Sequence, residues 1–118
     1  MTSDARKPFD AAAFLRQVGG DHALGIEILN MFRDDCPARV AAIRAAVQRG
    51  DADDIRTAAH TLKGSASYLT AVFVVEAAAR LELLGREGRV SEAAAVLERL
   101  DAAVAQVMPE IQRAALEP

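Results

Sequence analysis

The most constraining feature of this chain is the spacing of its apolar residues, which follow the helical period in every long segment. No segment shows the apolar–polar alternation of a half-buried β-strand. Short turns separate the periodic segments, as at Arg49-Gly50-Asp51, where Gly50 suits the end of one helix and Asp51 the start of the next. This pattern predicts an all-α fold, namely an antiparallel four-helix bundle with a short extra N-terminal helix.

The first half of the chain is predicted to hold the short helix and the first helix of the bundle. Asp10 suits the N-cap of the short helix, which Gly19-Gly20 would close. Asp21 would cap the next helix, and Pro37 either kinks that helix or sits in the first turn of a second one. The expected apolar stripe after Asp21 consists of Leu24, Ile28, Leu29 and Phe32.

The second half is predicted to hold three more helices. One covers about residues 52–69, and the next ends at Gly85 or Gly88, in a polar turn that spans residues 85–89. Ser91 would cap the last helix. Pro109 would kink or end that helix, and the tail to the C-terminus is expected to fray.

Length and composition indicate a single domain. The 118 residues suffice for one core, which we expect to span about residues 9–107 without a disulfide or a metal. Cys36 is the single cysteine and is expected to be a small buried apolar residue. The bundle should be sufficient as a monomer.

Charge and hydropathy exclude several classes of protein. A net charge of −3 with only 4% aromatic residues argues against a nucleic-acid-binding protein. No stretch is long and apolar enough to cross a bilayer, and the N-terminus lacks the apolar run of a secretory signal, so we expect no membrane partner and a cytoplasmic location. The two histidines, His22 and His60, make a poor metal site by themselves, and His22 is expected to be a surface residue.

The segment AAHTLKGSASYL, residues 58–69, places a glycine inside a predicted helix four positions after His60. At about 100° per residue, His60 lies about 160° from the core position Leu62 and therefore faces away from the core. Gly64 and Ser67 follow it along the same outer line, which would let a partner approach the imidazole closely. Lys63 could bring an ammonium to an anion on that imidazole, and Arg56 adds positive charge one turn earlier.

A purely structural interpretation of this segment also exists. A surface histidine is commonly just solvated, and Lys-Gly often marks the end of a helix. The apolar rhythm continues past Gly64 to Leu69 and Phe73, which weakens the helix-end interpretation.

The segment resembles the histidine-containing phosphotransfer (HPt) domain family. The family motif H-x-L-K-G-S is matched by His60, Leu62, Lys63, Gly64 and Ser65, and LELLGREG follows about twenty residues later. The resemblance covers about residues 9–107 and implies a bundle helix whose exposed histidine carries a phosphoryl group between receiver aspartates. In one departure, Thr70 stands where the family commonly has a glycine, which leaves the geometry of the 69–72 turn open.

The resemblance implies roles for individual residues. His60 would be phosphorylated, Lys63 would stabilise the phosphoryl oxygens, and Glu82 would hold the Nδ1–H of the imidazole so that Nε2 is the nucleophile. Receiver docking would involve Arg56, Thr57, Gly64 and Ser67. The helix that begins at Asp21 is a weaker candidate for a second docking element, because the sequence does not separate its buried face from a docking face.

The resemblance also implies partners. These are response-regulator receiver domains and a hybrid sensor histidine kinase, with Mg²⁺ supplied by the receiver and no cofactor of the chain's own. No nucleotide-binding motif is present, so we expect a phosphotransfer intermediate and neither an autonomous kinase nor a hydrolase. Two alternatives remain: a receiver-binding scaffold without phosphotransfer, and a hydrolytic enzyme that uses His60 as a general base, for which no nucleophile stands at a suitable spacing.

Overall fold

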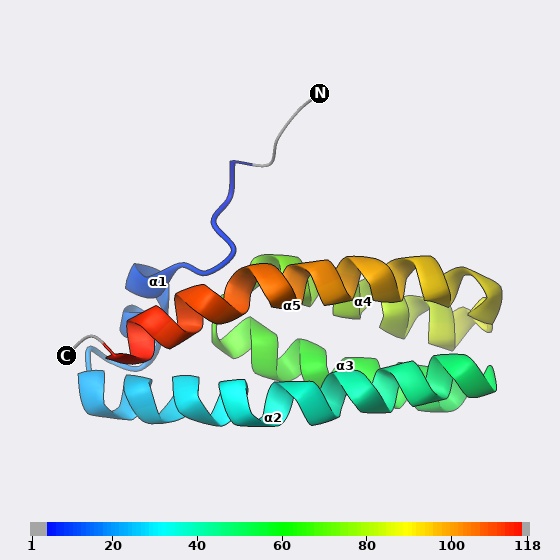
Figure 1. Cartoon of the computed structure of the whole chain (residues 1–118), viewed down its shortest axis with the longest axis horizontal. Coiled ribbons are helices and arrows are strands. Elements are labelled where there is room, and N and C mark those ends of the chain that lie inside the picture. Colours follow the sequence, from blue (N-terminus) through cyan, green and yellow to red (C-terminus); the bar gives the residue numbers. More distant parts are fainter. Residues whose placement is uncertain (1–4, 117–118) are drawn as a thin grey trace.

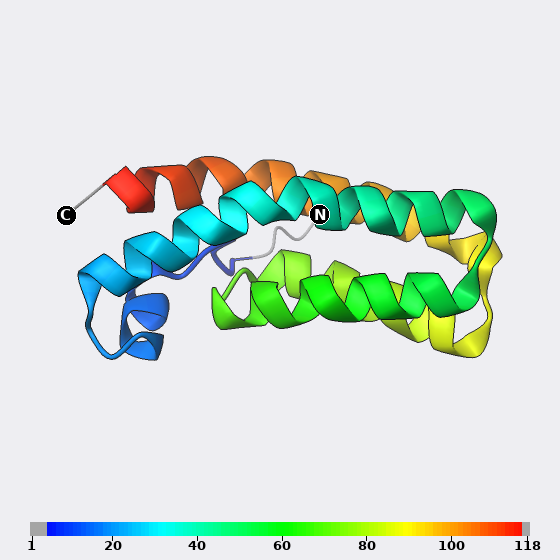
Figure 2. The same ribbon diagram turned by 90° about the horizontal axis from the view of Figure 1, so that it is seen from below.

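The computed structural model describes residues 5–116, and within them it contains helices and turns but no strand. The elements are α1 (Ala11–Gln17), α2 (His22–Arg49), α3 (Ala52–Tyr68), α4 (Val72–Glu87), a 3₁₀ turn η1 (Val90–Glu92) and α5 (Ala93–Leu116). Figure 1 shows four long helices side by side with α1 at one end. In Figure 2, α2 and α5 form one layer and α3 and α4 the other, and α1 lies where α2 and α5 extend beyond their partners. The predicted all-α bundle with a short additional helix is confirmed.

Side-chain capping by aspartate begins three of the helices, as predicted. The carboxylates of Asp10, Asp21 and Asp51 each accept a hydrogen bond from the backbone N–H three residues later, at 3.0 to 3.1 Å. Gly50 ends α2 with a φ of +66°, a left-handed conformation that glycine adopts without steric cost. These ends are set by local chemistry, so the sequence was sufficient to predict them.

The two prolines for which the sequence left a kink or a helix end open both lie inside continuous helices. Pro37 is within α2 and Pro109 within α5, which settles the alternatives in favour of helices that continue past the proline. The apolar residues on either side explain this, because Phe32 and Val40 in α2, like Val107 and Ile111 in α5, are buried in one core and hold both halves in register. The tail that was expected to fray continues as helix to Leu116, and residues 117–118 lie outside the described residues.

One predicted helix start is wrong, and the two alternatives for the end of α4 are resolved in favour of Gly88. Ser91 does not cap α5: it lies within η1, where the N–H of Glu92 donates to the carbonyl of Arg89, and α5 begins at Ala93. Residues 85–89 are not all turn, because α4 runs to Glu87 and ends at Gly88 with a φ of +70°. Gly85 is therefore a buried helical residue.

One apolar core joins all five helices. Its buried residues run from Phe9 to Ile111, which passes the expected limit at residue 107. Cys36 is fully buried as predicted, and burial raises the pKa of its thiol to about 11. The expected stripe on α2 was partly wrong: Leu29 and Phe32 are buried, whereas Leu24 is exposed.

Gly85 sets how closely α4 approaches α3. A Cβ built on Gly85 would lie 2.7 Å from the carbonyl oxygen of Ala52 and 2.7 Å from the backbone nitrogen of Arg56. Both are backbone atoms of the first turns of α3, so no side-chain rotation could make room. The two helices therefore touch backbone to backbone at this point, which fixes α4 against α3.

Thr70 occupies the turn between α3 and α4 with a φ of +63°. A residue with a Cβ adopts this left-handed conformation at a cost of roughly 1–2 kcal/mol. The N–H of Ala71 still donates to the carbonyl of Ala66, as at a helix that ends in glycine, and the Thr70 hydroxyl donates to the carbonyl of Asp10 at 3.1 Å. The turn thus keeps the geometry of a glycine-ended helix, and the threonine adds a contact to the start of α1.

Candidate functional site

His60 lies in the middle of α3 on the side turned away from the core. Its side chain is 66% exposed, while Ala59 and Leu62 beside it are fully buried. The Nδ1 atom of the imidazole lies 2.8 Å from Oε2 of Glu82, and no other described residue of 5–116 forms a hydrogen bond with the ring. The contact fixes one ring nitrogen and leaves Nε2 available to a partner.

Glu82 is the one charged residue in the buried part of the described chain. It projects from α4, and its side chain is only 8% exposed. Lys63 Nζ lies 2.5 Å from Oε1, and an Arg86 guanidinium nitrogen lies 3.4 Å from Oε2, the oxygen that also contacts His60. Two cations and the imidazole therefore compensate one buried carboxylate, as a buried charge requires.

The surroundings of Glu82 favour its ionised form. The hydrogen bond from Lys63 is the largest effect that lowers the pKa of this carboxyl below 4.5, and the contact with His60 lowers it further. Burial acts in the opposite direction but is outweighed. Glu82 is therefore a carboxylate at neutral pH, and a neutral imidazole must place its proton on Nδ1 to donate to it.

The lowered pKa of Glu82 predicts a pH-dependent contribution to stability. Because the folded-state pKa lies below the unfolded value of 4.5, the contribution is complete above 4.5 and is lost as pH falls through the folded pKa. We expect wild type to lose stability in acid relative to Glu82→Gln, which cannot ionise. Thermal unfolding of both proteins at pH 7, 5 and 3 measures this, and a difference in Tm that stays constant over the three values would contradict it.

The strip beside His60 is open, as the sequence predicted. A Cβ on Gly64 would meet nothing within 4 Å, so no neighbour within the chain requires glycine there. Ser67 and Thr57 are exposed on the same helix, and Arg56 is half-buried. The hydroxyl of Thr57 donates to the backbone carbonyl of Asp53. Gly64 is therefore a docking candidate whose residue type has no explanation within the described chain.

The structure gives Lys63 a partner that was not predicted, and it adds one residue to the site. The ammonium of Lys63 contacts the buried carboxylate of Glu82. Arg86 was not predicted, although it stands four residues after Glu82, a spacing that brings a glutamate and an arginine together on a helix. This spacing in the sequence could have predicted the contact between Arg86 and Glu82.

A second exposed surface adjoins α3. Met31 is 58% exposed, and Leu24 on α2 and Tyr68 at the end of α3 are exposed large apolar residues. Met31 and Tyr68 line one cavity of about 180 Å³ between the two helices. The structure thus shows which side of α2 is buried and which side carries exposed apolar residues. The sequence alone did not distinguish these two faces.

Residues 5–116 contain no group of three or more side chains suited to hold a metal ion. None of the helices in this part of the chain is long and apolar enough to span a membrane.

Comparison with known proteins identifies the family. The model of the Hpt domain family matches residues 27–110, which include His60, Lys63 and Glu82. The fold is similar to the crystal structure of histidine-containing phosphotransfer protein B (HptB) from Pseudomonas aeruginosa PAO1, with a TM-score of 0.86 and 26% sequence identity over 95% of this chain and 96% of that one. A search of curated proteins gave no match. With a family match over most of its length and a bundle of the same shape, the chain belongs to the Hpt domain family.

Proposed function

We propose that this protein is a phosphorelay shuttle that accepts a phosphoryl group on Nε2 of His60 from a receiver aspartate and passes it to another. The observation that carries the proposal is the pairing of His60 Nδ1 with Glu82 at 2.8 Å on an otherwise exposed imidazole. This arrangement selects the tautomer in which Nε2 bears the lone pair, and it leaves that atom accessible to a second protein.

The transfer requires little covalent machinery. The Nε2 lone pair attacks phosphorus as the bond from phosphorus to the aspartate oxygen breaks, and the aspartate leaves as a carboxylate. The ring then carries a proton on Nδ1 and phosphorus on Nε2, and its positive charge faces the carboxylate of Glu82. Because Nδ1 keeps its proton, the reverse step releases a neutral imidazole, so the same residues serve both directions.

Lys63 and Arg86 would help to compensate the charge of the phosphoryl group. The charged groups of both side chains contact Glu82 in the unphosphorylated protein. Both side chains are long and flexible, and Glu82 in turn contacts the imidazole. A phosphoryl group brings about two negative charges, so we infer that Lys63 exchanges Glu82 for a phosphoryl oxygen. We propose that Mg²⁺ comes from the acidic site of the receiver and that the chain uses no cofactor of its own.

The docking surface would combine α3 with the outward face of α2. A receiver approaching His60 along Gly64 and Ser67 would meet no bulky side chain. Beside this strip, Met31 and Tyr68 offer apolar area of the kind enriched in interfaces. We propose one copy of the chain per receiver, with Arg56 and Thr57 at the edge of the contact and a hybrid sensor kinase among the sources of phosphate.

The contacts around His60 do not favour a hydrolase. The candidate nucleophile Ser65 donates its hydroxyl to the backbone carbonyl of Thr61 and forms no hydrogen bond with His60. A serine nucleophile needs the histidine within hydrogen-bond reach. A scaffold without phosphotransfer is distinguished from a shuttle by the labelling experiment that follows.

Labelling of the two histidines tests the proposal. The purified protein is incubated with phosphorylated receivers from the same cell, and the products are analysed by mass spectrometry under non-acidic conditions. We expect an acid-labile phosphate in wild type and in His22→Gln, and none in His60→Gln, because the chain contains only these two histidines. Receiver binding by wild type without any phosphate on His60 would instead support a scaffold.

A further inference from the structure

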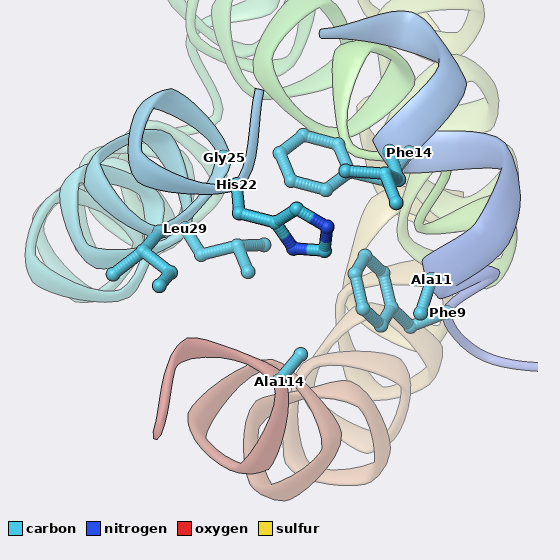
Figure 3. A pocket seen from close by; sticks show the side chains of 9 residues that line it. Phe9, Ala11, Phe14, His22, Gly25, Leu29 and Ala114 are labelled. Atoms are coloured by element: carbon cyan, nitrogen blue, oxygen red, sulfur yellow. The ribbon is translucent and has the colours of Figure 1, made fainter. Parts of the chain in front are cut away.

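A cavity lies at the end of the bundle where α1 packs beside α2 and α5. Its volume is about 150 Å³, and its lining comes from the chain before α1, from α1 itself, from the first turns of α2 and from Ala114 of α5. Figure 3 shows Phe9, Phe14 and Leu29 turned toward one space, with Ala114 on its far side. None of the lining residues belongs to the cluster around His60 and Glu82, so the cavity is separate from the phosphotransfer site.

His22 gives this cavity its single polar side chain. The other eight lining residues are alanine, glycine, leucine, isoleucine and phenylalanine. The imidazole of His22 points inward between the rings of Phe14 and Phe9 (Figure 3), although the residue stands at the exposed start of α2. No hydrogen bond joins this imidazole to another described residue of 5–116, and because His22 is exposed its ring also meets solvent.

The dimensions and the walls of the cavity select a single ring as its occupant. An apolar cavity of about 150 Å³ in another protein takes up benzene. Phe9 and Phe14 stand with ring centroids 5.9 Å apart and planes tilted by 51°, which offers a guest ring both a face and an edge. We propose that the cavity is a binding site for a neutral single-ring aromatic compound with one hydroxyl group, which hydrogen-bonds to His22.

The charge of the lining excludes other compounds of this size. No lysine, arginine, aspartate or glutamate lines the cavity. A carboxylate on the guest would therefore lose hydration against largely apolar walls with one imidazole as its only polar side-chain neighbour, which is unfavourable. A guest without any polar group would cover the imidazole without replacing its hydrogen bonds to water, so a hydroxyl group on the guest favours binding.

A titration monitored by NMR tests the proposal on the whole protein. Phenol, toluene and benzoate are added separately to wild type, and shifts of the aromatic and methyl resonances of Phe9, Phe14 and Leu29 are followed. We expect saturable shifts at these residues with phenol, binding several-fold weaker with toluene, and the weakest with benzoate. Contacts between phenol protons and Phe14 observed in wild type would place the ring without recourse to any variant.

Two variants separate the ring site from the hydroxyl contact. Ala114→Leu adds a side chain within the cavity and should abolish the shifts, whereas Ala105→Leu on the exposed face of the same helix should preserve them. His22→Phe should bind phenol and toluene equally. Shifts that are absent from wild type, spread over the surface, or unchanged in folded Ala114→Leu would overturn the site, and a preference for phenol that survives in His22→Phe would overturn the role of His22.

Discussion

Gly85→Ala should destabilise the protein by about 3 kcal/mol, the upper end of the usual range for overpacking. The added Cβ would lie 2.7 Å from two backbone atoms in the first turns of α3, so α4 would have to move away from α3. The same movement would also separate Glu82 from His60, since these residues sit on the two helices. Chemical denaturation monitored by circular dichroism measures the loss.

Gly64→Ala is the matched control, because it makes the same chemical change on α3 in open space. Alanine is favoured over glycine in a helix interior by roughly 0.5–1 kcal/mol, so this variant should be slightly more stable than wild type. Equal effects of the two substitutions on unfolding would contradict the close contact assigned to Gly85.

Gly64→Leu should weaken receiver binding by at least about tenfold, which corresponds to about 1.4 kcal/mol. The leucine Cβ would meet nothing within 4 Å in the free protein, and the side chain would fill the strip that leads to His60. The loss would therefore come from a clash with the partner and not from unfolding. Isothermal titration with a receiver measures the change in Kd.

Ala105→Leu, on the exposed side of α5, controls for added apolar surface elsewhere. It should leave the Kd unchanged. If Gly64→Leu binds the receiver as tightly as wild type does, the receiver does not dock along this strip.

Three of the four predicted N-caps, which depend on local chemistry, are confirmed, and Ser91 is the exception, whereas the local pattern did not predict the close contact at Gly85. The caps at Asp10, Asp21 and Asp51 use a side chain and a backbone group three residues apart, so the sequence contains both partners side by side. The partners of Gly85 stand about thirty residues earlier in the chain, and nothing in the local pattern separates it from a glycine that ends a helix. Pro37 stayed ambiguous because tertiary packing decides whether a helix continues through a proline.

The site shows the same division. The exposure of His60 followed from helical geometry, and its pairing with Glu82 was implied by the family resemblance. The inward orientation of Lys63 was not predictable, because it depends on how deeply Glu82 is buried. His22 is exposed as expected, but its ring turns toward a cavity that only the packing of α1 creates.

The most direct test of the proposed function is to determine which nitrogen carries the phosphoryl group. Protein with ¹⁵N-labelled histidine is phosphorylated by a receiver, and couplings between phosphorus, nitrogen and ring protons are measured by NMR. We predict a single phosphohistidine at His60 with phosphorus on Nε2 and a proton on Nδ1, because Glu82 occupies the Nδ1 side. Phosphorus bonded to Nδ1 of His60, or to His22, would contradict the proposed role of Glu82 and with it the shuttle mechanism.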